Sequence, residues 1–168
     1  YLTTVPVRRR VVLLGKFLAA LLVAALLTGG GFLLSFLAAA LYRLGDAQAW
    51  AQLGVFLAAA LLALFCYGSL FTALGAFMRK SILLGLFFVF GWESVVQYFP
   101  GVTQKFTIAH WVKSLLPMPP RRDSFLAFQL QPSPPLQSVL TLLVCGALFL
   151  LIGILIFARK EYILSDNI

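Results

Sequence analysis

The sequence is poor in the residues that solubility, catalysis and covalent cross-linking require. Only 11% of its 168 residues are charged, five are acidic, and it has one histidine and two cysteines. A soluble globular domain carries about 25% charged residues, so this composition excludes an ordinary cytosolic enzyme and a disulfide-rich secreted scaffold. Hydrophobic residues instead make up 62% of the chain, and the mean hydropathy is +1.01. That abundance excludes a disordered chain and predicts a polytopic membrane protein.

Four segments are apolar over the length of about 20 residues that a transmembrane helix needs. We expect spans at residues 11–41, 53–78, 81–99 and 136–158. These runs are continuous and rich in Leu and Ala, whereas the strands of a membrane barrel alternate between apolar and polar residues. The sequence therefore predicts an all-α, polytopic membrane helix bundle, with residues 1–168 as a single transmembrane domain.

The basic residues divide unequally between the two sets of span ends, eight against five. The richer set is Arg8, Arg9, Arg10, Lys16, Arg79, Lys80, Arg159 and Lys160. The poorer set is Arg43, Lys105, Lys113, Arg121 and Arg122. By the positive-inside rule, residues 1–10, the turn at 79–80 and the tail 159–168 should be cytoplasmic, and residues 42–52 and 100–135 external. We therefore interpret the net charge of +8 as topology and expect membrane lipid, not nucleic acid, as its partner.

The predicted external segment 100–135 contains more than a plain loop. Residues 104–116 place Ile108 and Trp111 on one helical face, and Thr107 and His110 on the other. This spacing predicts an amphipathic helix lying in the outer interface. A second apolar piece at residues 125–130, between prolines, predicts a shallow or re-entrant hairpin.

The sequence offers little for covalent chemistry. No metalloprotease or serine-hydrolase motif is present, and Gly29–Gly31 lacks the Gly-Lys-Ser/Thr that completes a phosphate-binding loop. Cys66 and Cys145 each lie in an apolar span, where a small core residue is the simplest interpretation. His110 has no partner at metal-ligand spacing, and we expect it to be an interfacial polar residue. We therefore expect no enzyme activity, cofactor or metal in this chain.

Glu93 is the one acidic residue inside a predicted span, where its cost is about 2.5–3.5 kcal/mol on insertion scales. It either reaches the outer interface or pairs with Arg43 or Lys105, or else it faces a polar cavity or gate on a substrate path. Gly29, Gly30 and Gly31 in mid-span permit close helix packing or local unwinding beside such a path. Thr72 adds mild polarity to the second span. We take these residues as candidates for a pathway or gate.

Three stretches carry a family resemblance. The first is the N-terminal pattern, in which the matching residues are Leu2, Thr3, Pro6, Val7, Arg8, Arg9, Arg10, Gly15 and Lys16. The second is the small-residue segment Gly68–Lys80, and the third is Phe90-Gly-Trp-Glu-Ser. Together they resemble the ABC-2 type transporter permeases.

The resemblance implies six spans with both ends inside, of which this chain would supply the last four. We therefore expect residues 1–168 to belong to a longer protein, with 100–135 as the external insertion. It also implies an ATP-binding cassette subunit docked in part on a coupling segment at residues 1–10, with Pro6, Arg8, Arg9 and Arg10 in that contact. A second permease copy or a homologue would complete the pathway. The expected location is a bacterial inner membrane, and the expected direction is export.

Two other functions stay open on the sequence. One is a secondary transporter or channel, which would need more intramembrane charge than Glu93 alone supplies. The other is an assembly or scaffold subunit of a membrane complex, with no transport pathway of its own.

Overall fold

The computed structural model describes residues 9–39, 47–77, 81–97, 102–117 and 133–159. Its three long helices are α1 (Arg9–Ala39), α2 (Ala47–Phe77) and α6 (Pro135–Arg159). Its short elements are α3 (Ser81–Leu86), the π-helix η1 (Phe87–Glu93), α4 (Ser94–Gln97), the 3₁₀ helix η2 (Val102–Phe106) and α5 (Ile108–Leu115). The prediction of an all-α helix bundle is confirmed.

Three of the described helices, α1, α2 and α6, are long and apolar enough to cross a membrane. They overlap the first, second and fourth predicted spans and differ from them by a few residues at the ends. The largest difference is that α2 begins at Ala47 rather than near residue 53. The third predicted span contains a shorter apolar helix, Leu83–Val96. Fourteen residues cover about 21 Å at helical rise, which is less than the roughly 30 Å of a bilayer core.

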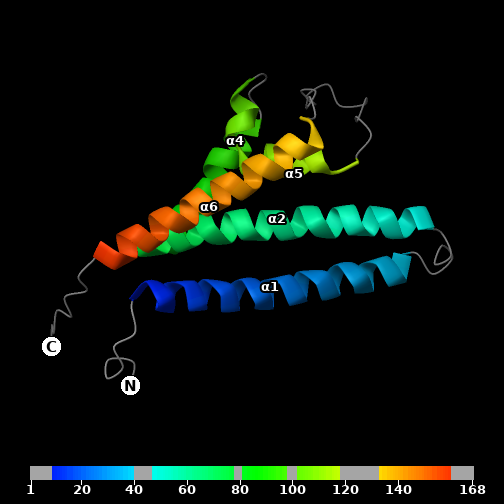
Figure 1. The fold of residues 1–168 in the computed structure, drawn as a ribbon. Coiled ribbons are helices and arrows are strands. Elements are labelled where there is room, and N and C mark those ends of the chain that lie inside the picture. The colour runs from blue at the N-terminus through cyan, green and yellow to red at the C-terminus, as the bar shows by residue number, and fades with distance from the viewer. Residues whose placement is uncertain (1–8, 40–46, 78–80, 98–101, 118–132, 160–168) are drawn as a thin grey trace.

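Helix α1 runs in the opposite direction to α2 and α6, which run parallel to each other, so three of their ends gather on one side (Figure 1). The start of α1, the end of α2 and the end of α6 lie at this side, and the end of α1 and the start of α2 lie at the opposite one. The element α6 crosses over α2, and the short helices α4 and α5 stand above them at the far end. We call the first side the basic end, because Arg10 and Arg159 lie there.

Helices α2 and α6 form the closest pair, and glycine makes their approach possible. A Cβ on Gly146 would stand 2.5 Å from the Phe65 ring, and one on Gly153 would stand 3.2 Å from the Cα of Ala73. The two glycines are seven residues apart and therefore lie on one face of α6. In a membrane, helices associate by close van der Waals contact between small residues. This pair forms the centre of the bundle, with Cys66 and Leu142 fully buried in it.

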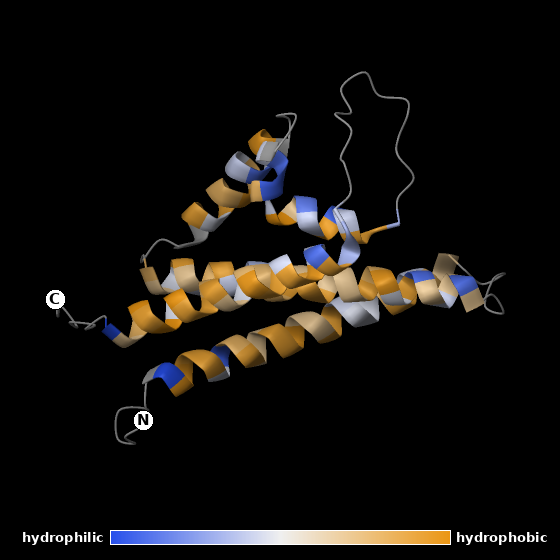
Figure 2. Ribbon diagram, turned by 45° about the horizontal axis from the view of Figure 1, so that its top comes forward, coloured by the Kyte–Doolittle hydropathy of each residue, from blue (hydrophilic) through white to orange (hydrophobic). Residues whose placement is uncertain are grey.

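Large apolar side chains cover the outside of the bundle. Helix α1 exposes most of its leucines, and Phe17 is its one buried residue in the described range. Figure 2 shows the hydrophobic colour along most of the long helices, with hydrophilic residues at the basic end, at the start of α2 and among the short helices. Such a surface suits lipid rather than water.

Candidate functional site

Glu93 joins three elements through its two carboxylate oxygens. The Tyr67 hydroxyl of α2 donates a hydrogen bond to Oε2. The backbone N–H of Ile108, the first residue of α5, donates to Oε1 at 3.1 Å. Glu93 itself ends η1 and is only 4% exposed. We call Glu93, Tyr67 and Ile108 the Glu93 junction. Its two donors satisfy a buried carboxylate, which would otherwise be costly in an apolar setting.

The π-helix turns Glu93 inward. In a π-helix, hydrogen bonds join residues five apart, so such residues lie nearer to one face than in an α-helix, where they are about 140° apart around the axis. Phe88, five residues before Glu93, packs against the buried core, while Phe87 and Phe90 are 73% and 70% exposed. The local backbone therefore places one aromatic ring and the carboxylate on the inner face. π-Helical turns of this kind are frequent at functional sites.

These contacts differ from the partners that the sequence suggested for Glu93. Its carboxylate bonds Tyr67 and a helix N-terminus rather than Lys105, and it is buried while its neighbour Trp92 is half exposed. Arg43, the other suggested partner, lies outside the described residues. Tyr67 was missed because the two positions are 26 residues apart and no local pattern connects them. A role for Glu93 in a pathway or gate stays a prediction.

A second polar group joins α5 to the start of α6. The Ser114 and Ser138 hydroxyls lie 2.7 Å apart, and His110 Nε2 lies 3.3 Å from the Ser133 hydroxyl. Thr107 caps α5 by accepting a hydrogen bond from the His110 N–H at 3.3 Å. We call this group the α5–α6 seam.

The α5–α6 seam shows that the polar face of α5 packs against protein. Thr107 is 1% exposed and His110 4%, so both side chains are enclosed by protein. The position of His110 at the membrane interface stays a prediction. The opposite face of α5, with Trp111 and Leu115, also packs against the core. The helix has protein on two sides because α2 and α6 both contact it. The predicted hairpin at residues 125–130 lies outside the described residues.

His110 is held in its neutral form by its surroundings. Burial lowers the pKa of the imidazole below its usual range, and the nearby charge of Lys105 lowers it further. Its Nδ1 is buried and has no hydrogen-bond partner among the described residues. A neutral ring carries one proton on its two nitrogens, so the bond to Ser133 and the bare Nδ1 suit the uncharged state.

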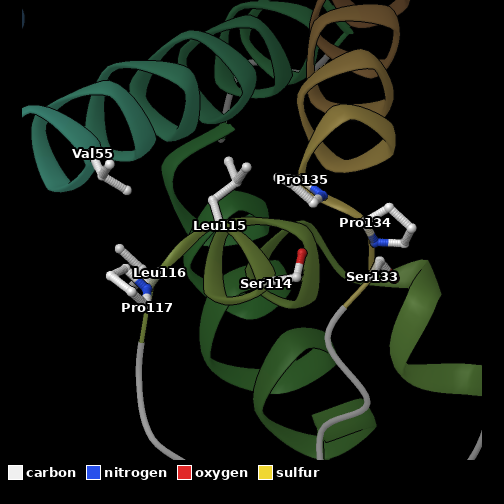
Figure 3. A pocket seen from close by; sticks show the side chains of 8 residues that line it. All are labelled: Val55, Ser114, Leu115, Leu116, Pro117, Ser133, Pro134 and Pro135. Carbon is white, nitrogen blue, oxygen red and sulfur yellow. The ribbon is translucent and has the colours of Figure 1, made fainter. Parts of the chain in front are cut away.

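An open groove of about 640 Å³ lies beside the α5–α6 seam (Figure 3). Its lining is Val55, Ser114, Leu115, Leu116, Pro117, Ser133, Pro134 and Pro135. Figure 3 shows Val55 of α2 on one side and the residues that precede α6 on the other, with Ser114 and Leu115 of α5 between them. The groove is mostly apolar, and its serines come from the seam and the segment beside it.

A second cavity, of about 430 Å³, lies between α1 and α2, and we call it the α1–α2 cavity. Its lining is Phe17, Ala20, Leu21, Ala24, Leu64, Tyr67, Gly68, Phe71 and Thr72. Thr72, a predicted pathway residue, therefore lines the same cavity as the Tyr67 that holds Glu93. Of the two pathway candidates, Thr72 lines the cavity itself, and Glu93 is linked to it through its hydrogen bond with Tyr67.

The three consecutive glycines lie elsewhere on α1. The helix continues through them without unwinding. A Cβ on Gly29 would meet Leu57 at 3.9 Å, and a Cβ on Gly30 or Gly31 would meet nothing in the described structure within 4 Å. Gly29 thus faces α2, while the other two leave α1 open for contact outside this chain or with lipid.

Most of the predicted coupling segment falls outside the description. Pro6 and Arg8 lie outside the described residues, Arg9 begins α1, and the Arg10 side chain is exposed at the basic end. Arg10 and Lys16 are six residues apart on α1, about 9 Å at helical rise. The exposed basic side chains of α1 therefore belong to its first two turns.

Comparison with known proteins agrees with this architecture. The family model described as ABC-2 family transporter protein matches residues 1–162. Neither the curated proteins nor the solved structures that were compared include a match. The family match spans nearly the whole chain, including the three long helices and the short elements between α2 and α6. The chain therefore belongs to the ABC-2 family of transporter proteins and is an integral membrane permease of an ABC transporter.

Proposed function

We propose that the chain is the permease subunit of an ATP-driven exporter and acts with a separate ATP-binding cassette subunit. The family match over residues 1–162 carries this proposal. Two copies, or one copy and a homologue, enclose the pathway in a bacterial inner membrane. Both ends of the chain face the cytoplasm, because the basic end then obeys the positive-inside rule.

The ATP-binding subunit docks in part on Pro6, Arg8, Arg9 and Arg10, directly before or at the start of α1. This segment immediately precedes α1 in the sequence, so a push on it would act first on α1. Helix α1 meets α2 where the rings of Phe17 and Phe65 pack edge to face, with centroids 6.2 Å apart. From α2, Tyr67 contacts Glu93, which holds α5. These contacts form a route from α1, through α2, to the short helices.

The pathway runs beside Thr72 and the Glu93 junction, and Gly29, Gly30 and Gly31 permit α1 to move against its neighbours. Polar groups at membrane depth are expensive and are commonly functional. At the Glu93 junction, the carboxylate holds α5 through one backbone donor and α2 through one side-chain donor. Movement of the third apolar segment is therefore transmitted to both helices together.

Co-purification tests the docking contact. The full-length protein is co-expressed with the ATP-binding subunit encoded beside it, and the permease is isolated through an affinity tag. We expect the triple variant Arg8→Glu/Arg9→Glu/Arg10→Glu to lose most of the bound ATPase, because three charges are reversed at the contact. The matched control, Arg159→Glu/Lys160→Glu, reverses basic residues of the same end and should retain it. Equal retention by both variants would overturn the docking site, and no ATPase with the unaltered protein would overturn the proposed partnership.

A further inference from the structure

The α1–α2 cavity has the chemistry of a hydrocarbon site. Of its lining residues, only Tyr67 and Thr72 carry side-chain oxygens. The Tyr67 hydroxyl donates to Glu93, and the Thr72 hydroxyl donates to the Gly68 carbonyl at 2.7 Å. Both donors are therefore occupied within the protein. The remaining lining is aliphatic or aromatic. An aliphatic chain can therefore fill the cavity without removing water from a free hydroxyl group.

Aromatic rings from α1 and α2 form part of the cavity wall. Phe17 is 6% exposed and packs edge to face on Phe65. Phe71 lies against the backbone of α3, where a Cβ on Gly85 would stand 2.1 Å from its ring. Close packing therefore fixes the Phe17 ring, while the Phe71 ring is 42% exposed and contacts α3 on one side.

An exposed cation, Lys16, precedes the cavity lining on α1. Lys16 is exposed and lies four residues before Ala20, which places the two on one face of α1. Long side chains on a helix lean toward its N-terminus, which for α1 lies at the basic end. Arg10 lies further along the same helix, about 9 Å closer to that end at helical rise.

We propose that the α1–α2 cavity holds one acyl chain of an anionic bilayer phospholipid, with its phosphate group at Lys16. In a membrane, a gap between helices is filled by lipid, and the tail gains little by moving from one apolar setting to another. Selectivity for the lipid therefore comes from its headgroup. One basic residue near the surface favours an anionic lipid by about fivefold. The aliphatic cavity and the exposed cation one helical turn before Ala20 together fit an amphiphile with a negative head.

The test measures lipid retention on the full-length permease and does not depend on its ATPase or on transport. The protein is reconstituted in nanodiscs of equal parts phosphatidylglycerol and phosphatidylcholine, released, and analysed by native mass spectrometry. We expect one phosphatidylglycerol per chain to survive release. Lys16→Gln should lower the ratio of retained phosphatidylglycerol to phosphatidylcholine about fivefold, and Lys16→Arg should restore it. Arg159→Gln, which removes a charge from the same end on α6, should leave the ratio unchanged.

A second pair of variants tests the cavity itself. Ala20→Leu/Ala24→Leu fills it from α1 and should reduce retention of both lipids. Ala19→Leu/Ala38→Leu adds the same volume at exposed positions of α1 outside the lining and should retain them. Unchanged retention in the filled variant would overturn the proposal, as would an equal effect of Arg159→Gln and Lys16→Gln. Since the ATPase is absent from this measurement, failure of the lipid site and failure of the docking contact remain distinguishable.

Discussion

At the scale of single residues, the burial of His110 makes the stability of the folded protein depend on pH. Its ring is 4% exposed, bonds Ser133 through Nε2 and leaves Nδ1 without a described partner. Burial and the charge of Lys105 both lower its pKa in the folded protein. The unfolded chain regains a pKa near 6.5, so it binds a proton at a pH where the folded protein does not. The contribution of neutral His110 to the free energy of unfolding is therefore fully present above a pH of about 6.5 and decreases as the pH falls toward the lower pKa of the folded protein.

We expect acidification from pH 7.5 to 5.0 to lower the thermal unfolding midpoint of the purified protein more than that of His110→Gln. Glutamine keeps a polar side chain but does not titrate, so the difference isolates the imidazole. A contribution of about 1 kcal/mol would correspond to roughly 2–4 °C for a chain of this size. Midpoints of the two proteins that decrease by the same amount would contradict the assigned role of His110.

At the scale of secondary structure, the third apolar segment differs most from a regular helix. A π-helix from Phe87 to Glu93 interrupts it and directs the carboxylate inward. Helix α5, only eight residues long, is too short to be stable by itself. It is held by packing on α2 and α6, by its Thr107 cap and by the Glu93 junction. The position of α5 therefore depends on a residue in a different element.

Substitution of Glu93 should consequently loosen α5. Glu93→Ala leaves the Tyr67 hydroxyl and the Ile108 N–H without their acceptor, at a cost of about 1–3 kcal/mol for each buried group. We expect hydrogen exchange of residues 108–115 in the full-length protein to accelerate tenfold or more. Tyr67→Phe removes one donor and should have a smaller effect. Ser94→Ala, at an exposed neighbour whose hydroxyl makes only a 3.5 Å contact, should have none. Protection of α5 in Glu93→Ala that equals the unaltered protein would show that the junction does not hold this helix.

At the scale of the whole molecule, the positions of the basic residues match the side on which the helix ends gather. Because α1 runs opposite to α2 and α6, the start of α1 and the end of α6 both lie at the basic end (Figure 1). Lys105 and Lys113 belong to the short elements at the far end. Because cytoplasmic segments carry the excess of Lys and Arg, the basic end should face the cytoplasm.

Labelling of introduced cysteines in intact cells checks this orientation. A membrane-impermeant maleimide should react with Gln52→Cys, an exposed position near the start of α2, without permeabilisation. It should react with Ser165→Cys only after the cells are permeabilised. The native Cys66 is fully buried and Cys145 lies within α6, so both should give little background. Reaction of Ser165→Cys from outside would reverse the proposed orientation.

The sequence by itself determined the fold class and the approximate position of three long helices. Length and hydropathy are local properties, so continuous apolar runs were sufficient for α1, α2 and α6. The short amphipathic helix was also visible as a helix, because its period is a property of neighbouring residues. Gly146 and Gly153 carried a signal in their spacing of seven, but nothing in the sequence identified α2 as the helix they meet.

Only the tertiary structure decided which polar groups meet. Glu93 was recognised as costly inside a span, yet its partners Tyr67 and Ile108 are 26 and 15 residues away. Amphipathicity marked one face of α5 as polar, but whether that face meets water or the serines of α6 depends on what packs against it. The local sequence determines the helical period of α5 and the free-energy cost of placing Glu93 in a span. The pairing of buried polar groups depends on how helices that are distant in the chain pack together.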